Sequence, residues 1–498
     1  MNNEIFNNIN GYALDEQQRS SILNAKKYSL IVAGAGSGKT LTLIGKIKYL
    51  MEVKKIKPEE ILCISFTNES TKSLQEKLGN KKIDCLTFHK LAIKLLDLNH
   101  YDFHICEEAF LRKCIDTFFE CFLYPSPLLK KEFKKVYKKL FLSQKKYNEW
   151  IKGHEFKTTK KTIETFISLY NTNCLTKQEF MALFTKKNKS ILLIIYSILQ
   201  YYEKEKELQG LLDFDDLIKK AKDIVKKKGK TPFYKEIIID EYQDTSLLRL
   251  HFIKSILDIT NANLTVVGDD FQSIYKFSGC DLNLFLHFSD YFPGASIHKI
   301  ENTYRNSQEL INLAGGFVMQ HKGQIHKDLK SKKSLEKPVK FIKEKEKRKT
   351  LLETILYVYK NYQGTLLILG RNNNDLYSYL QKEEIEVKDS GYFTLKKYPS
   401  IPLRYLTAHK SKGLESDQVI LINLENKTLG FPSQIEDPSI LKGIKKEENF
   451  LYAEERRLFY VALTRTKNYV FLLVPRNESI FITEIKKDKV NTEWINIH

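Results

Sequence analysis

A short apolar run that leads into a glycine-rich loop and then into a helical pattern is the most restrictive feature of this sequence. Residues 29–32 read SLIV, residues 33–40 read AGAGSGKT, and apolar side chains recur at helical spacing at Leu43, Ile44 and Ile47. In a strand–loop–helix of this kind, the loop amides and the helix N-terminus point at phosphate oxygens. The run therefore predicts an α/β fold with a P-loop.

The residue types in this loop predict how a nucleotide would be held. Lys39 is expected to reach the β- and γ-phosphates of ATP, and Thr40 is expected to place its hydroxyl on Mg²⁺. Ala33 stands where the pattern usually begins with glycine. The rest of the loop would surround the phosphates with its backbone, at Gly34, Ala35, Gly36, Ser37 and Gly38.

Two acids follow another apolar run about 200 residues downstream. Residues 236–239 read EIII and lead into Asp240 and Glu241, so both carboxylates are expected at the end of a buried strand. Asp240 can hold Mg²⁺ there, and Glu241 can orient and deprotonate the attacking water. Acids at a strand end often serve only to cap a helix. The P-loop upstream favours the catalytic interpretation.

Further apolar runs divide the chain into two α/β units. Strands are expected at 29–32, 61–64, 236–239 and 264–267, and then at 295–300, 365–369, 419–424 and 469–474. Residues 93–204 lack such runs and carry Lys, Phe, Tyr and Leu at helical spacing. We expect a first domain at 1–92 and 205–280, a Lys-rich helical insertion at 93–204, and a second domain at 281–498.

Charge and cysteine content limit the class of protein. The chain has 498 residues with 81 Lys and Arg against 61 Asp and Glu, a net charge of +20, which favours nucleic acid as a partner over an acidic membrane surface. None of the seven cysteines forms a C-x-x-C pair, and this predicts reduced thiols rather than a metal cluster. The polar N-terminus and the absence of a long apolar run predict a cytoplasmic protein with no membrane partner.

Residues 240–245 read DEYQDT, and together with the 33–40 loop this string resembles the UvrD/Rep/PcrA family of superfamily 1 DNA helicases. Other family motifs appear in the family's order: LDEQQR at 14–19, SFTN at 65–68, TFH at 87–89, VGDDFQSIY at 267–275, ENTYRNS at 301–307, TAHKSKGLE at 407–415 and EERRLFYVALTR at 454–465. The resemblance implies two RecA-like P-loop NTPase domains that couple ATP hydrolysis to 3′→5′ movement on single-stranded DNA.

The resemblance also implies roles at the nucleotide. Gln18 would read adenine, Tyr304 would stack on it, and Glu415 would contact the ribose or tune closure of the cleft. Gln272 would sense the γ-phosphate, while Arg305 and Arg465 would neutralise its charge from the second domain. ATP should therefore bind between the two domains. Leu41 stands where the family commonly has an arginine that covers the base, so nucleotide selectivity would be looser.

Contacts to DNA are implied in the same way. The stacking candidates are Phe66, Tyr275, Phe277 and Phe481, and the backbone-contact candidates are Thr87, His89 and His409. For each aromatic side chain, ordinary core packing is the alternative. Phe277 replaces the usual Trp and Ser278 replaces the usual Arg, and both changes weaken the expected contacts at this point.

Two Lys-rich stretches and one missing segment complete the expectations. Residues 128–162 carry twelve Lys and three acids, with Phe133, Val136, Tyr137, Leu140 and Phe141 on one helix face. This stretch, like residues 322–349, is either an arm that grips duplex DNA or a solvated surface. Thr407 follows Asn373 by only 34 positions, so the family's second insertion is expected to be absent or vestigial.

Three functions remain open on the sequence alone. The first is a helicase acting on single strands and at single-strand/duplex junctions. The second is a DNA-stimulated ATPase that translocates without unwinding. The third is a nucleotide-switched DNA-binding subunit of a larger complex. A protein partner also stays open, because a motor without accessory domains would benefit from one.

Overall fold

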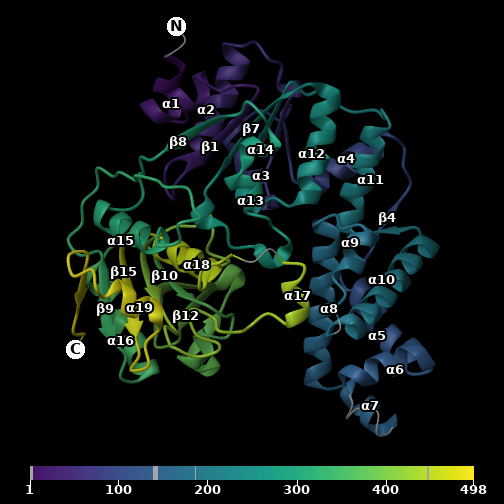
Figure 1. Cartoon of the computed structure of the whole chain (residues 1–498). Helices are drawn as coiled ribbons and strands as arrows, with labels where there is room; N and C mark the ends of the chain where they lie inside the picture. Colours follow the sequence, from purple (N-terminus) through teal and green to yellow (C-terminus); the bar gives the residue numbers. More distant parts are fainter. Residues whose placement is uncertain (1–3, 138–143, 186, 446–447, 498) are drawn as a thin grey trace.

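The computed structural model describes residues 4–137, 144–185, 187–445 and 448–497. We divide them into a first lobe (4–103 and 213–300), a helical arm (104–212) and a second lobe (301–497). Figure 1 shows the first lobe at the top, the second lobe below it, and the arm beside the second lobe. Among the described residues, no helix combines the length and the apolar character needed to cross a membrane.

A six-stranded sheet forms the centre of the first lobe, and every neighbouring pair of strands is parallel. The four inner strands are nearly all buried, which is typical of a sheet covered on both faces by helices, and the two edge strands are partly exposed. Their order is β3 (Asp84–Leu86), β2 (Ile61–Ile64), β6 (Glu236–Ile239), β7 (Asn263–Gly268), β1 (Tyr28–Ala33) and β8 (Ser296–Ile300).

Two layers of helices bury the faces of this sheet. Ile22, Leu43 and Leu74 belong to the apolar cluster on one face, and Leu91, Leu217 and Ile253 belong to the cluster on the other. The helices of the first layer are α1 (Glu16–Leu23), α2 (Lys39–Glu52) and α3 (Asn68–Leu78). Those of the second layer are α4 (Phe88–Leu98), α11 (Phe214–Lys226) and α12 (Leu247–Thr260).

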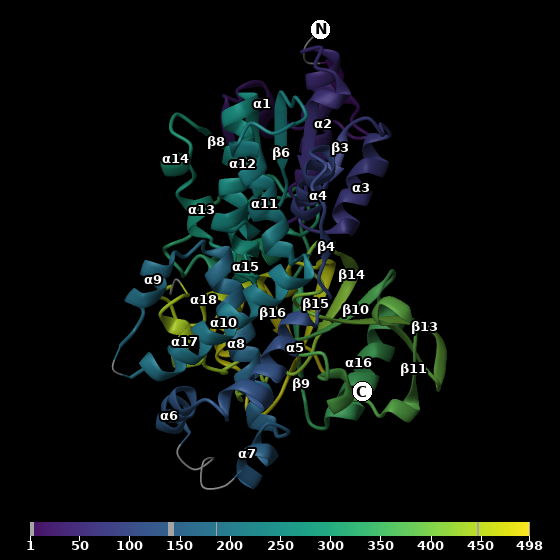
Figure 2. The same ribbon diagram turned by 90° about the vertical axis from the view of Figure 1, so that its right-hand side faces the viewer.

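The arm leaves and re-enters the first lobe through a pair of short parallel strands, β4 (His104–Ile105) and β5 (Leu211–Leu212). Its helices enclose a separate aromatic-rich core that includes Phe119, Trp150, Phe166 and Phe180. Figure 2 shows these helices stacked below the first lobe. They are α5 (Phe110–Thr117), α6 (Pro127–Val136), α7 (Gln144–Trp150), α8 (His154–Thr172), α9 (Lys177–Ala182) and α10 (Lys189–Gln209).

The second lobe contains an eight-stranded sheet with a short antiparallel extension. The order is β11 (Ile385–Val387), β12 (Tyr392–Leu395), β13 (Tyr398–Thr407), β10 (Leu366–Gly370), β14 (Ser416–Leu421), β15 (Thr466–Val474), β9 (Val339–Lys343) and β16 (Thr492–Trp494). Only the β11–β12 and β12–β13 pairs are antiparallel. This meander occupies the position where a second insertion was expected to be vestigial.

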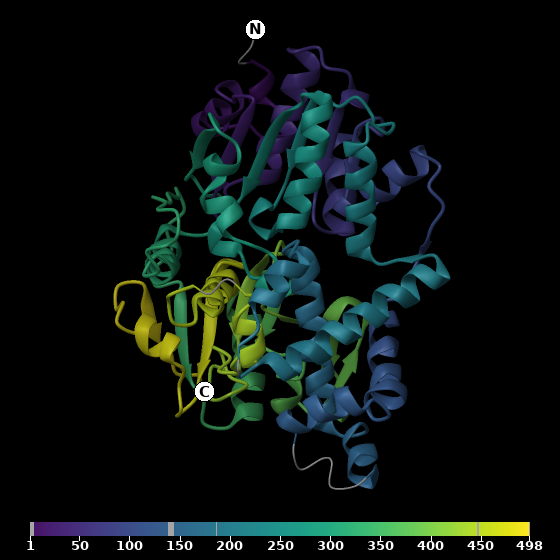
Figure 3. The ribbon, with the colours of Figure 1, turned by 45° about the vertical axis from the view of Figure 1, so that its right-hand side comes forward.

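Helices cover both faces of the second sheet. Phe317, Phe459 and Phe481 lie in the cluster on one face, while Leu351 and Ile355 lie in the cluster on the other. The helices are α15 (Gln308–Val318), α16 (Lys347–Asn361), α18 (Ala453–Leu463) and α19 (Ile480–Ile485). A further short helix, α17 (Ser439–Lys442), reaches across to the arm, where Ile440, Leu441 and Ile444 join the arm's core (Figure 3).

The structure differs from the expected domain limits at both ends of the insertion and at the start of the second domain. The second half of α4, residues 93–98, belongs to the first lobe rather than to the insertion, because Leu95 and Leu96 are buried in the core of that lobe. Residues 295–300 were assigned to the second domain, but β8 pairs with β1 and closes the first sheet. The first lobe therefore continues to about Ile300, and the insertion runs from about 104 to 212 rather than from 93 to 204.

The expected Lys-rich helix is only partly described. Helix α6 ends at Val136, Phe133 is buried, and Val136 is exposed, so the apolar face is narrower than its spacing predicted. Lys138, Lys139, Leu140 and Phe141 lie outside the described residues. Lys131, Lys134 and Lys135 are exposed on the arm.

Candidate functional site

The glycine-rich loop connects β1 to α2 with the geometry that phosphate binding needs. Gly36 and Gly38 have φ of 70° and 75°, a left-handed conformation that favours glycine. A Cβ at Gly36 would also lie 2.5 Å from Cβ of Arg305 and 2.8 Å from Oγ1 of Thr303. The second lobe therefore approaches the loop so closely that only glycine fits.

Lys39 begins α2 and reaches the edge of the sheet where the acids lie. Its Nζ is buried and makes no hydrogen bond to any described residue, although it lies 3.4 Å from Oε1 of Glu241. A buried ammonium without hydrogen-bond acceptors is costly. Phosphate oxygens would supply the missing acceptors, so the position of this side chain fits a bound nucleoside triphosphate.

Asp240 and Glu241 end β6 side by side, and their surroundings separate their acidities. Burial and the charge of Glu241 raise the pKa of Asp240 to about 6. Burial would also raise the pKa of Glu241, but Lys39 and Lys412 outweigh it and lower that pKa to about 2. Glu241 is therefore ionised at neutral pH and can accept a proton or a hydrogen bond from water.

Thr40 and Asp240 line the same cleft between the lobes. No group of three or more His, Cys, Asp or Glu side chains that could hold a metal occurs among the described residues. A Mg²⁺ ion at Thr40 and Asp240 would therefore need phosphate oxygens and water to complete its coordination, as is usual for this ion. The donor set fits Mg²⁺ brought in with a nucleotide.

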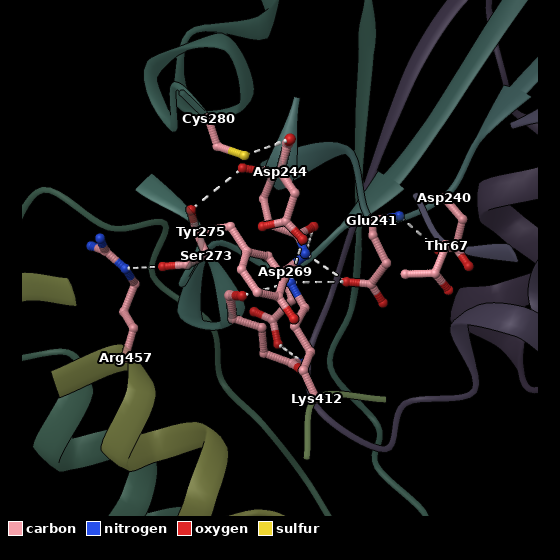
Figure 4. Close-up of polar contacts among 12 residues, drawn as sticks. Thr67, Asp240, Glu241, Asp244, Asp269, Ser273, Tyr275, Cys280, Lys412 and Arg457 are labelled. Atoms are coloured by element: carbon pink, nitrogen blue, oxygen red, sulfur yellow. Dashed lines mark hydrogen bonds and ion pairs between the residues drawn. The ribbon is translucent and has the colours of Figure 1, made fainter. Parts of the chain in front are cut away.

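Lys412 contacts the candidate catalytic carboxylate of Glu241, and sequence analysis left it without a role. It lies in the loop between β13 and β14 of the second lobe, and its Nζ donates to Oδ2 of Asp244 (2.5 Å) and to the carbonyl oxygen of Gln272 (2.8 Å). It also lies 3.6 Å from Oε2 of Glu241. Figure 4 shows this lysine crossing from the second lobe to the carboxylates of the first. The 407–415 motif contained it, but a lysine gives no signal of burial.

Arg465 lies between α18 and β15, with a side chain that is only 1% exposed. Its guanidinium donates to neutral oxygens, including those of Val461, Leu414 and Gln272, and forms no ion pair with a described carboxylate. Burial and the nearby charge of Arg305 lower the pKa of Arg465 to about 9. A buried cation without a counter-charge is suited to an incoming anion.

Arg305 lies on the other side of the loop. Its Nε donates to Oε2 of Glu415 (2.9 Å), and its Nη1 donates to the carbonyl oxygen of Thr464 (3.4 Å). The next residue back, Tyr304, donates its backbone amide to the carbonyl oxygen of Gly36 (2.9 Å). The structure thus brings Arg305, Arg465 and the loop that carries Lys39 together. Glu415 is engaged with Arg305 rather than directed at an open ribose site.

Gln18 and Tyr304 flank the loop on the side expected for the base. Gln18 is buried, and both ends of its amide are anchored: Oε1 accepts from the Asp15 amide (2.9 Å), and Nε2 donates to the carbonyl oxygen of Ser37 (3.0 Å). These two bonds leave one N–H and one lone pair of the amide for adenine. The ring of Tyr304 is 61% exposed, and its hydroxyl donates to Oδ2 of Asp15 (2.6 Å). It is therefore available for stacking.

Gln272 ends a short 3₁₀ turn, Asp270–Gln272, at the interface of the lobes. Its Nε2 donates to Oδ2 of Asp269 (2.6 Å), and its Oε1 accepts from Nη2 of Arg465 (3.3 Å). Phe271 and Ile274, on either side of it, are buried in the core of the second lobe. Gln272 is held between the lobes beside the arginine expected at the γ-phosphate.

An aromatic cluster begins at Tyr275, three residues after Gln272 in the sequence. The rings of Tyr275, Phe277 and His409 have centroids 5.9–6.4 Å apart, and Phe277 is 53% exposed. They line a groove of about 1310 Å³ with Arg371, Lys410 and Lys427 of the second lobe and Lys161 of the arm. Exposed aromatic rings beside basic side chains are what a single strand of DNA requires. Burial and Arg371 lower the pKa of His409 to about 4, so this ring is neutral at pH 7.

Three other DNA candidates are largely occupied inside the first lobe. Phe66 packs edge-on against Phe88 at 5.5 Å and lies beneath the guanidinium of Arg249. The hydroxyl of Thr87 caps α4 by accepting from the Lys90 amide (3.3 Å). His89 packs on Phe214, and burial together with Arg249 lowers its pKa to about 4. Phe66 and His89 are partly exposed, and Thr87 is buried.

Phe481 is the one DNA candidate that the structure contradicts. It is 0% exposed and packs against Phe317, Phe431 and Phe459 in the core of the second lobe. Its ring cannot stack on a base without unfolding α19, so the alternative of core packing is correct. The resemblance gave no signal of this, because a buried and an exposed aromatic residue look alike in sequence.

The chain is similar to helicases over almost its whole length. Residues 14–293 match the family model of the UvrD/REP helicase N-terminal domain, and residues 393–477 match that of the UvrD-like helicase C-terminal domain. DNA helicase IV of Escherichia coli is 26% identical over 97% of this chain and 71% of its own length. A probable DNA helicase II homolog of Mycoplasma capricolum is 29% identical over 64% of this chain, and srs2 of Schizosaccharomyces pombe, an ATP-dependent DNA helicase, is 28% identical over 64%.

These last two relatives are much longer than the region shared with them, which spans 42% and 36% of their lengths. The family motifs converge in the structure: the glycine-rich loop, the two acids at the end of β6, the 3₁₀ turn with Gln272 and the two arginines meet at one cleft. Motif order, geometry and family models agree, and the chain belongs to the UvrD/REP family of DNA helicases.

Proposed function

We propose that this chain is an ATP-dependent motor that moves 3′→5′ on single-stranded DNA and separates the strands at single-strand/duplex junctions. One observation supports it most strongly. Arg465 is buried beside the glycine-rich loop with only neutral partners, and the γ-phosphate of ATP would supply the missing counter-charge.

In the proposed cycle the nucleotide is held from both lobes. Lys39 and the amides of residues 34–38 bind the phosphates on one side, while Arg305 and Arg465 bind the γ-phosphate on the other. Glu241 accepts a proton from the attacking water, and Lys412 keeps that carboxylate ionised and in place. Mg²⁺, held by Thr40 and Asp240, would neutralise charge that develops on the phosphate oxygens.

Hydrolysis would be transmitted to DNA over a short path. Gln272 contacts Arg465, and Tyr275 lies three residues beyond it in the DNA groove. Lys412 binds the carbonyl oxygen of Gln272, and Tyr275 donates to the carbonyl oxygen of His409 (3.3 Å). Loss of the γ-phosphate would release Arg465, shift the 270–275 segment and change the grip of Tyr275, Phe277 and His409 on the strand.

The cell compartment is inferred from the thiols. All seven cysteines are free, including Cys63 and Cys85, which are direct neighbours on β2 and β3. A reducing cytoplasm would keep them so. A protein partner that raises processivity would suit a motor whose second insertion is reduced to a short meander.

The test uses the purified chain with duplexes that carry a 3′ or a 5′ single-stranded tail. We expect DNA-stimulated ATP hydrolysis and strand separation from the 3′ tail only, both lost in Lys39→Ala and Glu241→Gln. ATPase activity without strand separation would favour a translocase. Turnover no faster than that of the two variants would favour a nucleotide-switched binding subunit. Separation from the 5′ tail alone would reverse the polarity.

A further inference from the structure

A segment of the second lobe returns to the first and lies against its edge. We call residues 324–331 the strap. Its backbone pairs with residues 301–303: the amide of Lys330 donates to the carbonyl oxygen of Glu301, and the amide of Thr303 donates to that of Lys330, both at 2.8 Å. Leu329 covers Gly34, where a Cβ would lie 2.6 Å from Cδ2 of the leucine. The strap thus lies against the phosphate loop.

Lys327 points from the strap into the protein. Its side chain is fully buried, and its Nζ forms ion pairs with Asp269 and with Oδ1 of Asp270 (2.6 Å). The same ammonium lies 3.4 Å from the centre of the Phe271 ring. Sequence analysis assigned this lysine to a charged surface stretch, and the structure places it in the interior.

Asp269 connects this lysine to the nucleotide side of the site. Its Oδ1 accepts from the Phe271 amide (3.2 Å) and pairs with Lys327, while its Oδ2 accepts from Nε2 of Gln272 (2.6 Å). Oε1 of Gln272 accepts from Arg465. The contacts therefore run from the strap through Asp269 and Gln272 to Arg465.

The direction of the Gln272 amide depends on the ionisation of Asp269. An ionised carboxylate only accepts hydrogen bonds, so it selects the NH₂ end of the amide and leaves the oxygen for Arg465. A buried aspartate without a cation would take up a proton, and the resulting acid could donate to the amide oxygen instead. Lys327 opposes that change, because its charge helps to keep the pKa of Asp269 low against the effect of burial.

We propose that Lys327 is a positioning residue for ATP hydrolysis. Through Asp269 it fixes the orientation of the Gln272 amide, so the response of Gln272 to the γ-phosphate depends on the docking of the strap. The inference rests on the proposed function, because it assigns Gln272 and Arg465 to the γ-phosphate. It adds a residue outside the family motifs quoted above. It also gives a reason why a lysine is buried with two carboxylates at this place.

The test compares Lys327→Met with Lys327→Arg and with Lys330→Met. Lys330 lies on the same strap but is exposed, and its ion pair with Asp328 is a surface pair. Two readouts are measured: kcat and KM for ATP with single-stranded DNA, and the ratio of the affinities for ATPγS and ADP. The second readout needs no turnover, so it stays informative if the chain does not unwind DNA. Wild-type protein without any preference for ATPγS would instead contradict the proposed function.

For Lys327→Met we expect kcat and the ATPγS/ADP ratio to fall by about 10- to 100-fold, the range for losing a hydrogen bond to a charged group, while KM changes by less than about threefold. Lys327→Arg should recover most of the loss, and Lys330→Met should stay within about twofold of wild type. A folded Lys327→Met protein that keeps both quantities overturns the proposal.

If Lys327→Met does not fold, Asp269→Asn provides the same comparison with little change in volume. It should lose ATPγS/ADP discrimination to the same extent, whereas Asp270→Asn, which removes a carboxylate that does not contact Gln272, should lose less. Equal losses in the two aspartate variants would mean that Lys327 serves only to neutralise a buried acidic pair, and would overturn the proposal.

Discussion

Replacing Arg465 with glutamine should separate the cost of burying its charge from the use of that charge. Burial and Arg305 lower the pKa of Arg465 from its ordinary value to about 9, which corresponds to roughly 5 kcal/mol against the charged form in the folded protein. Glutamine removes this cost but also removes hydrogen bonds from the cation to the carbonyl oxygens of Val461 and Leu414, worth about 1.5–3 kcal/mol each. We expect the nucleotide-free variant to be as stable as wild type, or more stable by up to about 2 kcal/mol.

Catalysis should respond in the opposite direction. An arginine at the γ-phosphate contributes about 10³- to 10⁵-fold to kcat in phosphoryl transfer, so Arg465→Gln should lose at least about 10³-fold, or roughly 4 kcal/mol. ATPγS with Mg²⁺ should also raise the Tm of the variant less than that of wild type. Urea unfolding, steady-state ATPase assays and thermal shifts measure these quantities. A variant that is clearly less stable without nucleotide, yet keeps its thermal shift and its kcat, would refute the reasoning.

The pH dependence of the wild type gives a second check on Arg465. Its pKa is lower in the folded than in the unfolded chain, so the unfolded chain binds more protons from about pH 9 up to the ordinary pKa of arginine. This residue alone should make stability rise with pH through that interval. The rise should be missing in Arg465→Gln. Urea titrations of both proteins at pH 8 and 10 measure the difference, and equal pH slopes would contradict the burial cost assigned to Arg465.

Four further outcomes follow from the same geometry. Phe277→Ala should weaken single-stranded DNA binding by about 10-fold or more with little change in Tm, because the ring is 53% exposed; anisotropy titration measures it. Phe481→Ala should instead cost about 3–5 kcal/mol of stability in urea unfolding, and a selective loss of DNA affinity would contradict its place in the core. The affinity for Mg²⁺ in the presence of ATP should fall by up to about tenfold per pH unit below about 6, the raised pKa of Asp240. Asp240→Asn should remove this pH dependence, which isothermal titration of the wild type and the variant measures. Changing Lys131, Lys134 and Lys135 to Gln should reduce the slope of log DNA affinity against log salt concentration by about 2–3. The same change at three exposed lysines of the first lobe should leave this slope unaltered: Lys226, Lys227 and Lys228.

Local patterns in the sequence predicted the parts of the fold that depend on local physics. Four apolar runs are strands of the first sheet, as predicted: 29–32, 61–64, 236–239 and 264–267. Short apolar runs of this kind between turns are typical of buried parallel strands. The loop that ends in Lys39 and Thr40 lies between a strand and a helix, as its glycines required. Residues 295–300 also form a strand, but no local pattern predicted which of the two sheets this strand would join.

Burial of polar and aromatic side chains was harder to predict, because it is decided by segments far away in the chain. Phe481 and Phe277 are both aromatic residues that the resemblance implied as DNA contacts, yet Phe481 is enclosed by α15 and α18 and Phe277 is exposed. Lys327 and Lys412 looked like ordinary surface lysines in a chain with a net charge of +20. Only the carboxylates brought near them from β6 and the 269–272 turn reveal their roles.

A structure with Mg²⁺ and a non-hydrolysable ATP analogue tests the central claim most directly. Our account predicts that the guanidinium groups of Arg305 and Arg465 lie within about 3 Å of γ-phosphate oxygens, with Nζ of Lys39 bound from the opposite side and Oε1 of Gln272 still facing Arg465. A nucleotide bound by the first lobe alone, with both arginines kept away from its phosphates, would contradict the account.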